Sequence, residues 1–175
     1  MSTTCPGCGL LVPATTGARD PQLDASPECL GVYHEVAARA LSDWRLAAHH
    51  QLAVDTYAAQ DAGAATPAVR VAFALLGLHW SLDLGLSGPE VRAAHGAAAR
   101  ASMTWPSFEL PPRVHDVTVF DVAAAETPQQ HVEELRRWAP RLWAGWACTR
   151  ASVEQLTAEL WPEIARAAAR VAPSR

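Results

Sequence analysis

The chain contains no lysine: all of its 14 basic residues are arginines, and its formal net charge is −4 at pH 7. The charge is mild and is not gathered into runs, which argues against the basic patch that nucleic-acid-binding proteins carry. We interpret the arginine preference, together with the many alanines, as the compositional bias of a GC-rich genome. We therefore expect no nucleic-acid partner.

Long apolar runs are also missing. Although 50% of the residues are hydrophobic, no run reaches the roughly 20 residues that span a membrane. The N-terminal segment lacks the charged and apolar regions of a secretion signal. Four cysteines in such a chain favour a reducing compartment, where thiols bind metals more often than they form disulfides. We expect a cytoplasmic protein without a membrane partner.

Cysteine is scarce, but two of the four cysteines form the motif Cys5-Pro6-Gly7-Cys8-Gly9. Two thiolates two residues apart can bind one metal ion, and the Pro and Gly residues favour a turn whose backbone N–H groups point at the sulfurs. The motif predicts a Zn²⁺ knuckle that ties residues 1–25 onto the rest of the chain. A redox-active CxxC is a weaker alternative, because such motifs follow a strand and open a helix, and we expect no strand before this one. Two unliganded surface thiols are the remaining alternative.

Residues 26–175 predict an all-α helical bundle of about five to six helices that forms one folding unit. Three helix starts carry N-cap signatures, at Ser26-Pro27, at Ser87 with Glu90, and at Thr127 with Gln130. Prolines between residues 104 and 117 predict an extended segment that crosses the bundle. The expected helices are 27–41, 44–60, 66–84, 88–102, 128–148 and one from about 151 that frays towards Arg175.

A zinc site normally has four ligands. Cys29 is the best third ligand, because the first turn of a helix favours a thiolate. Cys148 is its rival, but it is expected to be a buried free thiol. His34, His49 and His50 are the nearby imidazoles. His34 follows Cys29 by five residues, which turns the two side chains roughly 140° apart on a helix; a simple helical hairpin places His50 level with His34. From the residues alone, the fourth ligand stays open.

Several short motifs, which follow one another along the chain, make most of the sequence resemble a bacterial family catalogued as domain of unknown function 5946. These motifs are Cys5-Pro-Gly-Cys8-Gly, Ser26-Pro-Glu-Cys29, Glu35-Val36, Ala38-Arg39, Ser42-Asp43, the run from His50 to Gln60, Trp105-Pro106, Pro111-Pro112, Thr118-Val119, Asp121-Val122, His131, Trp138-Ala139 and Trp143.

The resemblance implies a histidine ligand at the position of His50, and therefore a Cys₃His zinc site made by Cys5, Cys8, Cys29 and His50. The chain departs from the family pattern at Gln60-Asp61-Ala62-Gly63, where the family tends to have Gln-His-Pro-Gly. It also has Ala74 where a histidine is expected. Any function that needs those two imidazoles is in doubt here, and the resemblance implies no activity.

Four protein ligands leave no open position on the metal, so we expect the zinc to be structural. The protein is then a binding or regulatory module for a small-molecule or protein ligand. Its binding groove is expected among the Pro-rich segment, the tryptophan-bearing helix and the zinc site, and such a groove also suits a homodimer interface.

The alternative function is a small hydrolase-like zinc enzyme, in which water occupies one metal position. Asp55, Tyr57 and His131 are the side chains that could assist such chemistry. The enzyme hypothesis requires these three residues to converge on one pocket.

Overall fold

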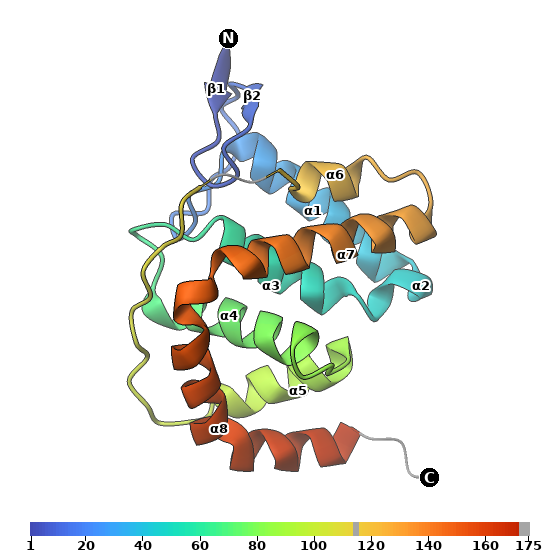
Figure 1. Cartoon of the computed structure of the whole chain (residues 1–175). Coiled ribbons are helices and arrows are strands. Elements are labelled where there is room, and N and C mark those ends of the chain that lie inside the picture. Colours follow the sequence, from blue (N-terminus) through green and yellow to red (C-terminus); the bar gives the residue numbers. More distant parts are fainter. Residues whose placement is uncertain (114–115, 172–175) are drawn as a thin grey trace.

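A computed structural model describes residues 1–113 and 116–171, with side chains described up to Arg166 (Figure 1). Its described part contains eight α-helices and one two-stranded sheet, which confirms the predicted all-α class with the cysteine-bearing segment near the first helix. The predicted fraying towards Arg175 falls on residues 172–175, outside the described residues. No described helix combines the length and the apolar character needed to cross a membrane. The elements are β1 (Ser2–Thr4), β2 (Leu11–Pro13), α1 (Pro27–Ser42), α2 (Trp44–Ala47), α3 (His50–Gln60), α4 (Ala68–Leu82), α5 (Gly88–Ala98), α6 (Val119–Ala123), α7 (Pro128–Gly145), the 3₁₀ helix η1 (Ala147–Thr149) and α8 (Arg150–Val171).

The helices begin where the capping residues predict. Ser26 accepts a backbone hydrogen bond at the start of α1. Ser87 and Glu90 form a reciprocal capping box at α5, and Thr127 and Gln130 form another at α7. These side chains satisfy backbone N–H groups that have no partner within the helix.

The predicted helix 44–60 is divided into α2 and α3. At the division, the His49 N–H donates to the Leu46 carbonyl at 2.8 Å, a tighter bond than the α-helical pattern. The Ala48 carbonyl lies against the start of α5: a Cβ placed on Gly88 would be only 2.3 Å from the Ala48 oxygen. The division between α2 and α3 therefore coincides with close packing of α5 against Ala48. The sequence has neither proline nor glycine at this division.

The N-terminal segment is a β-hairpin where the sequence predicted a loop. Strands β1 and β2 are antiparallel, with Ser2 opposite Pro13 and Thr4 opposite Leu11. In the turn between them, the Cys5 N–H donates to the Leu10 carbonyl at 2.8 Å. The hairpin projects from one end of the molecule, and its turn reaches the start of α1 (Figure 1).

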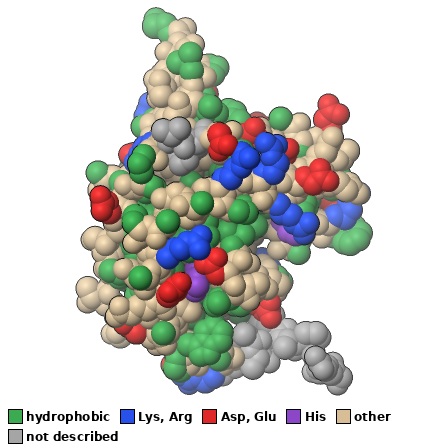
Figure 2. Space-filling model, viewed as in Figure 1, with side chains coloured by type: hydrophobic (Ala, Val, Ile, Leu, Met, Phe, Trp, Pro, Cys, Tyr) green, Lys and Arg blue, Asp and Glu red, His purple; other side chains and the backbone are tan. Residues whose placement is uncertain are grey.

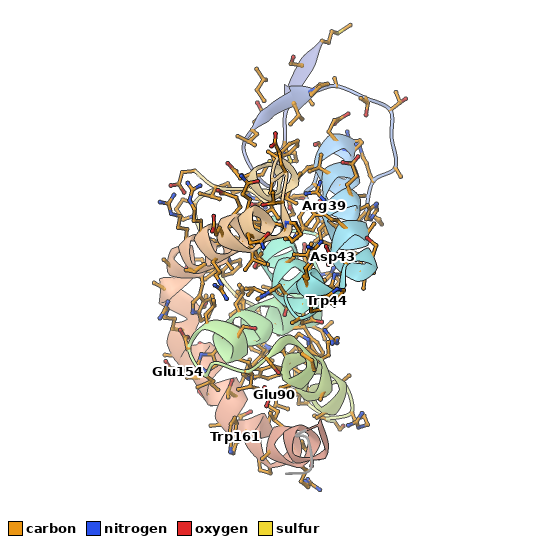
Figure 3. The ribbon with its side chains drawn as sticks, turned by 90° about the vertical axis from the view of Figure 1, so that its right-hand side faces the viewer. Arg39, Asp43, Trp44, Glu90, Glu154 and Trp161 are labelled. Atoms are coloured by element: carbon orange, nitrogen blue, oxygen red, sulfur yellow. The ribbon has the colours of Figure 1, made fainter. Side chains whose placement is uncertain are left out.

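Two apolar clusters fill the interior, and α3 and α7 contribute to both. One cluster joins α4, α5 and α8 and contains Trp80, Trp143 and Trp146; the other joins the hairpin, α1 and α6 and contains Trp138. These four tryptophans are fully buried. Trp44 is instead 85% exposed, at the turn from α1 into α2 (Figure 3). On the face shown in Figure 2, acidic and basic side chains are intermingled.

Candidate metal centre

Three cysteines meet at the junction of the hairpin and α1. The sulfurs of Cys5, Cys8 and Cys29 lie within 4.8 Å of one another, and each cysteine is at most 1% exposed. Cys5 and Cys8 come from the hairpin turn, whereas Cys29 comes from the first turn of α1, where Ser26 caps the helix by accepting from the Cys29 N–H at 3.2 Å. A group of this kind could hold a metal ion.

Hydrogen bonds to the Cys5 sulfur favour its thiolate form. The Ser26 N–H donates to the Cys5 sulfur at 3.3 Å, and the backbone N–H groups of Cys8 and Leu10 approach the sulfurs of Cys5 and Cys8. The Cys29 thiol beside Cys5 is the largest cause that lowers the pKa of Cys5. The same contact with Cys5, followed by the contact with Cys8 and burial, raises the pKa of Cys29. Since the thiolate is the metal-binding form of cysteine, the cluster already stabilises one ligand.

Asp61 adjoins the cluster, and sequence reasoning did not predict it there. It follows the last residue of α3 and is fully buried; its Oδ1 lies 4.0 Å from the Cys29 sulfur. Its Oδ2 accepts a hydrogen bond from Gln60 Nε2 at 3.2 Å, and the Gln60 Oε1 accepts from Trp138 Nε1 at 2.9 Å. Burial and the nearby Cys5 raise the pKa of Asp61 to about 8.

The knuckle turn packs directly on the Asp61 carboxylate. A Cβ on Gly7 would lie 1.7 Å from Asp61 Oδ1, so only glycine allows this approach. Around it, the Asp24 N–H donates to the Asp61 carbonyl at 2.8 Å. Arg113, from the proline-rich segment, donates to the Pro6 carbonyl at 2.6 Å and to the Asp24 carboxylate at 2.8 Å. Three separate segments of the chain therefore hold the turn in place.

The structure does not bring His50 to the three cysteines. His50 begins α3 whereas Asp61 follows its end, and 11 residues at 1.5 Å rise separate them by about 16 Å. The physical reason is that α1 and α3 pack in opposite directions, so the start of α1 lies beside the end of α3. Burial, and then the charge of the nearby Arg92, lowers the pKa of His50. The structure therefore brings together three of the four predicted ligands, Cys5, Cys8 and Cys29, and leaves His50 apart from them.

The other candidate ligands also lie elsewhere. His34 lines a pocket beside α1 and is not in the sulfur group. Cys148 is an exposed free thiol in η1, not the buried one that was expected. A strand does precede the CxxC motif, contrary to expectation, but the chain turns back into β2 and does not enter a helix.

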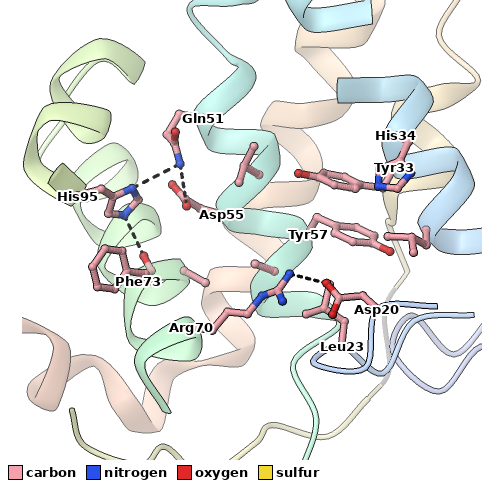
Figure 4. Close-up of a pocket in the computed structure, with 14 residues that line it drawn as sticks. Asp20, Leu23, Tyr33, His34, Gln51, Asp55, Tyr57, Arg70, Phe73 and His95 are labelled. Atoms are coloured by element: carbon pink, nitrogen blue, oxygen red, sulfur yellow. Dashed lines mark hydrogen bonds and ion pairs between the residues drawn. The ribbon is translucent and has the colours of Figure 1, made fainter. Parts of the chain in front are cut away.

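A pocket of about 320 Å³ lies between α1, α3, α4 and α5 (Figure 4). It is lined by aromatic, carboxylic and amide side chains as well as aliphatic ones. Its lining residues are Asp20, Leu23, Leu30, Tyr33, His34, Gln51, Val54, Asp55, Tyr57, Ala58, Arg70, Phe73, Ala74 and His95.

A hydrogen-bonded chain forms one wall of this pocket. Gln51 Nε2 donates to Asp55 Oδ1 at 3.0 Å and lies 3.4 Å from His95 Nδ1. His95 Nε2 lies 3.0 Å from the Phe73 carbonyl, which only accepts, so Nε2 carries the proton. Burial lowers the pKa of His95 to about 4 and raises the pKa of Asp55 well above its ordinary value. Asp55 Oδ2 is buried and has no hydrogen-bond partner among the described residues.

The opposite wall carries an ion pair and two stacked rings. Arg70 donates to Asp20 Oδ2 at 2.8 Å and to Gln22 Oε1 at 2.9 Å, so its charge is already paired. Tyr33 stacks on Tyr57 with 3.9 Å between ring centroids. Tyr57 also borders the metal centre: burial, Asp61 and then Cys29 raise its pKa. Tyr57 therefore borders both the pocket and the sulfur cluster.

The three side chains considered for catalysis do not converge. Asp55 and Tyr57 line the pocket, but His131 is buried in α7 and is not among the lining residues. Beside the proline-rich segment, a small cavity of about 10 Å³ is bordered by Ala62, Pro111 and Trp146.

The model of a family described as "Family of unknown function (DUF5946)" matches residues 3–147 of the chain. The matched region contains the three clustered cysteines, Asp61 and all residues that line the pocket. The chain matches no curated protein and no solved structure.

Proposed function

Because the chain belongs to DUF5946, a family whose description assigns no activity, we propose a function from the site itself. The protein is a small-molecule-binding module stabilised by one structural Zn²⁺. Cys5, Cys8 and Cys29 hold the metal, which fastens the hairpin to the start of α1. The observation that carries this proposal is the gathering of three buried sulfurs within 4.8 Å of one another.

The chemistry of the donors supports zinc. Tetrahedral Zn²⁺ with bonds of about 2.3 Å to sulfur keeps its sulfurs about 3.8 Å apart, and the limit of 4.8 Å in the cluster is compatible with that spacing. Three thiolates are soft ligands that suit Zn²⁺ better than Mg²⁺ or Ca²⁺.

Burial of the sulfurs supports a structural role over a catalytic one. A catalytic zinc keeps an open position for water that substrate can reach. Here all three cysteines are at most 1% exposed, and none of them lines the pocket. The enzyme alternative also needs His131 beside Asp55 and Tyr57, and His131 does not line that pocket.

Metal removal tests the structural role. Metal binding is expected to contribute about 4 kcal/mol to the free energy of unfolding, which corresponds to roughly 8–16 °C in the melting temperature of a domain of this size. We therefore expect dialysis against a strong chelator to lower the melting temperature by about 10 °C. Added Zn²⁺ should restore the original melting curve, whereas Mg²⁺ should not. An unchanged melting temperature after verified metal loss would rule out a stabilising metal.

For the pocket, the charges favour a small organic amine as ligand. Asp20 and Arg70 form an ion pair and cancel each other's charge, and His95 is neutral at pH 7, so Asp55 is the lining carboxyl group without a charged partner. An ammonium group brings a positive charge and N–H donors, and Asp55 Oδ2 has no donor among the described residues.

Binding of matched probes tests the ligand class. By protein NMR, benzylamine should shift the resonances of pocket residues with a Kd of about 1 mM, a modest affinity for so few atoms; benzoate should not. The variant Ala58→Leu, which fills part of the pocket from α3, should abolish the benzylamine shifts. Equal binding of the two probes, or benzylamine shifts that survive Ala58→Leu, would exclude an amine site here.

A further inference from the structure

We infer that Asp61 is the fourth ligand of the metal, completing a Cys₃Asp site through its Oδ1. This inference rests on the proposed binding of a metal by the three cysteines. It replaces His50, which lies at the far end of α3 from the cluster.

The position of Asp61 Oδ1 suits a ligand. With zinc bonds of about 2.3 Å to sulfur and 2.0 Å to oxygen, a tetrahedral site places a sulfur and an oxygen about 3.5 Å apart. The distance from Asp61 Oδ1 to the Cys29 sulfur is 4.0 Å. Asp61 is not within 4.8 Å of all three sulfurs, so metal binding requires a small closure of the carboxylate towards Cys5 and Cys8.

The surroundings of Asp61 leave one oxygen free for the metal. Gln60 Nε2 donates a hydrogen bond to Asp61 Oδ2 at 3.2 Å, and Trp138 Nε1 donates one to Gln60 Oε1. A carboxylate oriented by an outer hydrogen-bond partner is the common arrangement of metal-ligating carboxylates. Among the described residues, the polar contact of Oδ1 is with Cys29.

Burial gives a second reason for a cation at this point. Asp61 is fully buried, and the carboxylate packs against the Gly7 turn. The guanidinium of Arg113 donates to the Asp24 carboxylate and to backbone carbonyls. A buried carboxylate beside sulfurs is costly unless a cation compensates it, and a metal bound to the cysteines does so.

The test uses Co²⁺ as a spectroscopic probe on the full chain, together with X-ray absorption of the zinc form. For the wild type we expect three sulfurs and one oxygen around the metal. Asp61→Cys should give four sulfurs and a stronger thiolate-to-cobalt charge-transfer band. Asp61→His should give three sulfurs and one nitrogen, since imidazole is also a standard zinc ligand. Three unchanged sulfurs in Asp61→Cys would overturn the assignment.

Affinity separates a ligand from a neighbouring residue. Asp61→Ala should weaken Zn²⁺ binding by more than about 100-fold, beyond the 10–100-fold that loss of an outer hydrogen-bond partner causes. Asp116→Asn, which changes an exposed carboxylate that pairs with Arg141 and is not part of the cysteine group, is the control and should leave the affinity within about 3-fold. Wild-type affinity in Asp61→Ala would refute the inference alone, whereas a wild type that binds no Co²⁺ through sulfur would refute the proposed metal site.

Discussion

Replacing Cys29 with serine is expected to remove the bound metal and to lower the free energy of unfolding by about 4 kcal/mol. Metal binding stabilises the folded protein by this amount when the free metal concentration exceeds the Kd about 1000-fold. Cys29 is fully buried and lies in the first turn of α1, so its sulfur connects the hairpin to the helices. Serine has nearly the same size, and the loss therefore reflects the missing thiolate more than a cavity. Urea unfolding, with metal analysis of the same samples, measures both effects.

The chain supplies a matched control for this experiment. Cys148 is exposed and lies outside the sulfur cluster. Cys148→Ser should keep the metal and change the stability by less than about 0.5 kcal/mol, as surface substitutions usually do. If the two serine variants lose equal stability, or if Cys29→Ser keeps its metal, then Cys29 does not hold the ion.

Replacing Gly77 with alanine is expected to destabilise the protein by about 3 kcal/mol, the upper part of the range for overpacking a core. The new Cβ would lie 2.1 Å from Asp55 Oδ2 and 2.4 Å from its carboxyl carbon, which no real contact allows. Asp55 cannot easily move, because Gln51 holds its Oδ1 at 3.0 Å and the residue is only 3% exposed. The helices α3 and α4, which form two walls of the pocket, would have to separate.

A double-mutant cycle gives this prediction its control. In an Asp55→Ala background, Gly77→Ala should cost at least about 1.5 kcal/mol less, because the clashing carboxyl group is gone. Gly31→Ala, in α1 with no atom within 4 Å of the new Cβ, should instead stabilise the protein by about 0.5–1 kcal/mol. Additive effects of the Gly77 and Asp55 changes, measured by urea unfolding, would contradict the observed contact.

Local signals predicted the helices well, because capping is a local property. The side chains of Ser26, Ser87 and Thr127 cap their helices as their spacing to the following residues indicates. The division between α2 and α3 had no such signal, since it accompanies the approach of Gly88 to the Ala48 carbonyl. The N-terminal hairpin was missed because its strands have three residues each, too few for a pattern of alternation.

The candidate site shows the same limit. The spacing of Cys5 and Cys8 predicted that they bind one metal, and the place of Cys29 in the first turn of a helix made it the third predicted ligand. The structure brings these three together. The fourth partner depends on how α1 and α3 lie side by side, which no spacing within one helix reveals. Asp61 had drawn notice only as a departure from the family pattern, although a carboxylate directly after α3 has the chemistry of a ligand.

The central claim is that three cysteines hold one metal ion. Native mass spectrometry of protein purified without chelators, compared with the denatured mass, tests it most directly. We predict one Zn²⁺ per chain, with all four thiols reduced after denaturation. A native mass equal to that of the bare chain, or a Cys5–Cys8 disulfide in its place, would contradict the claim.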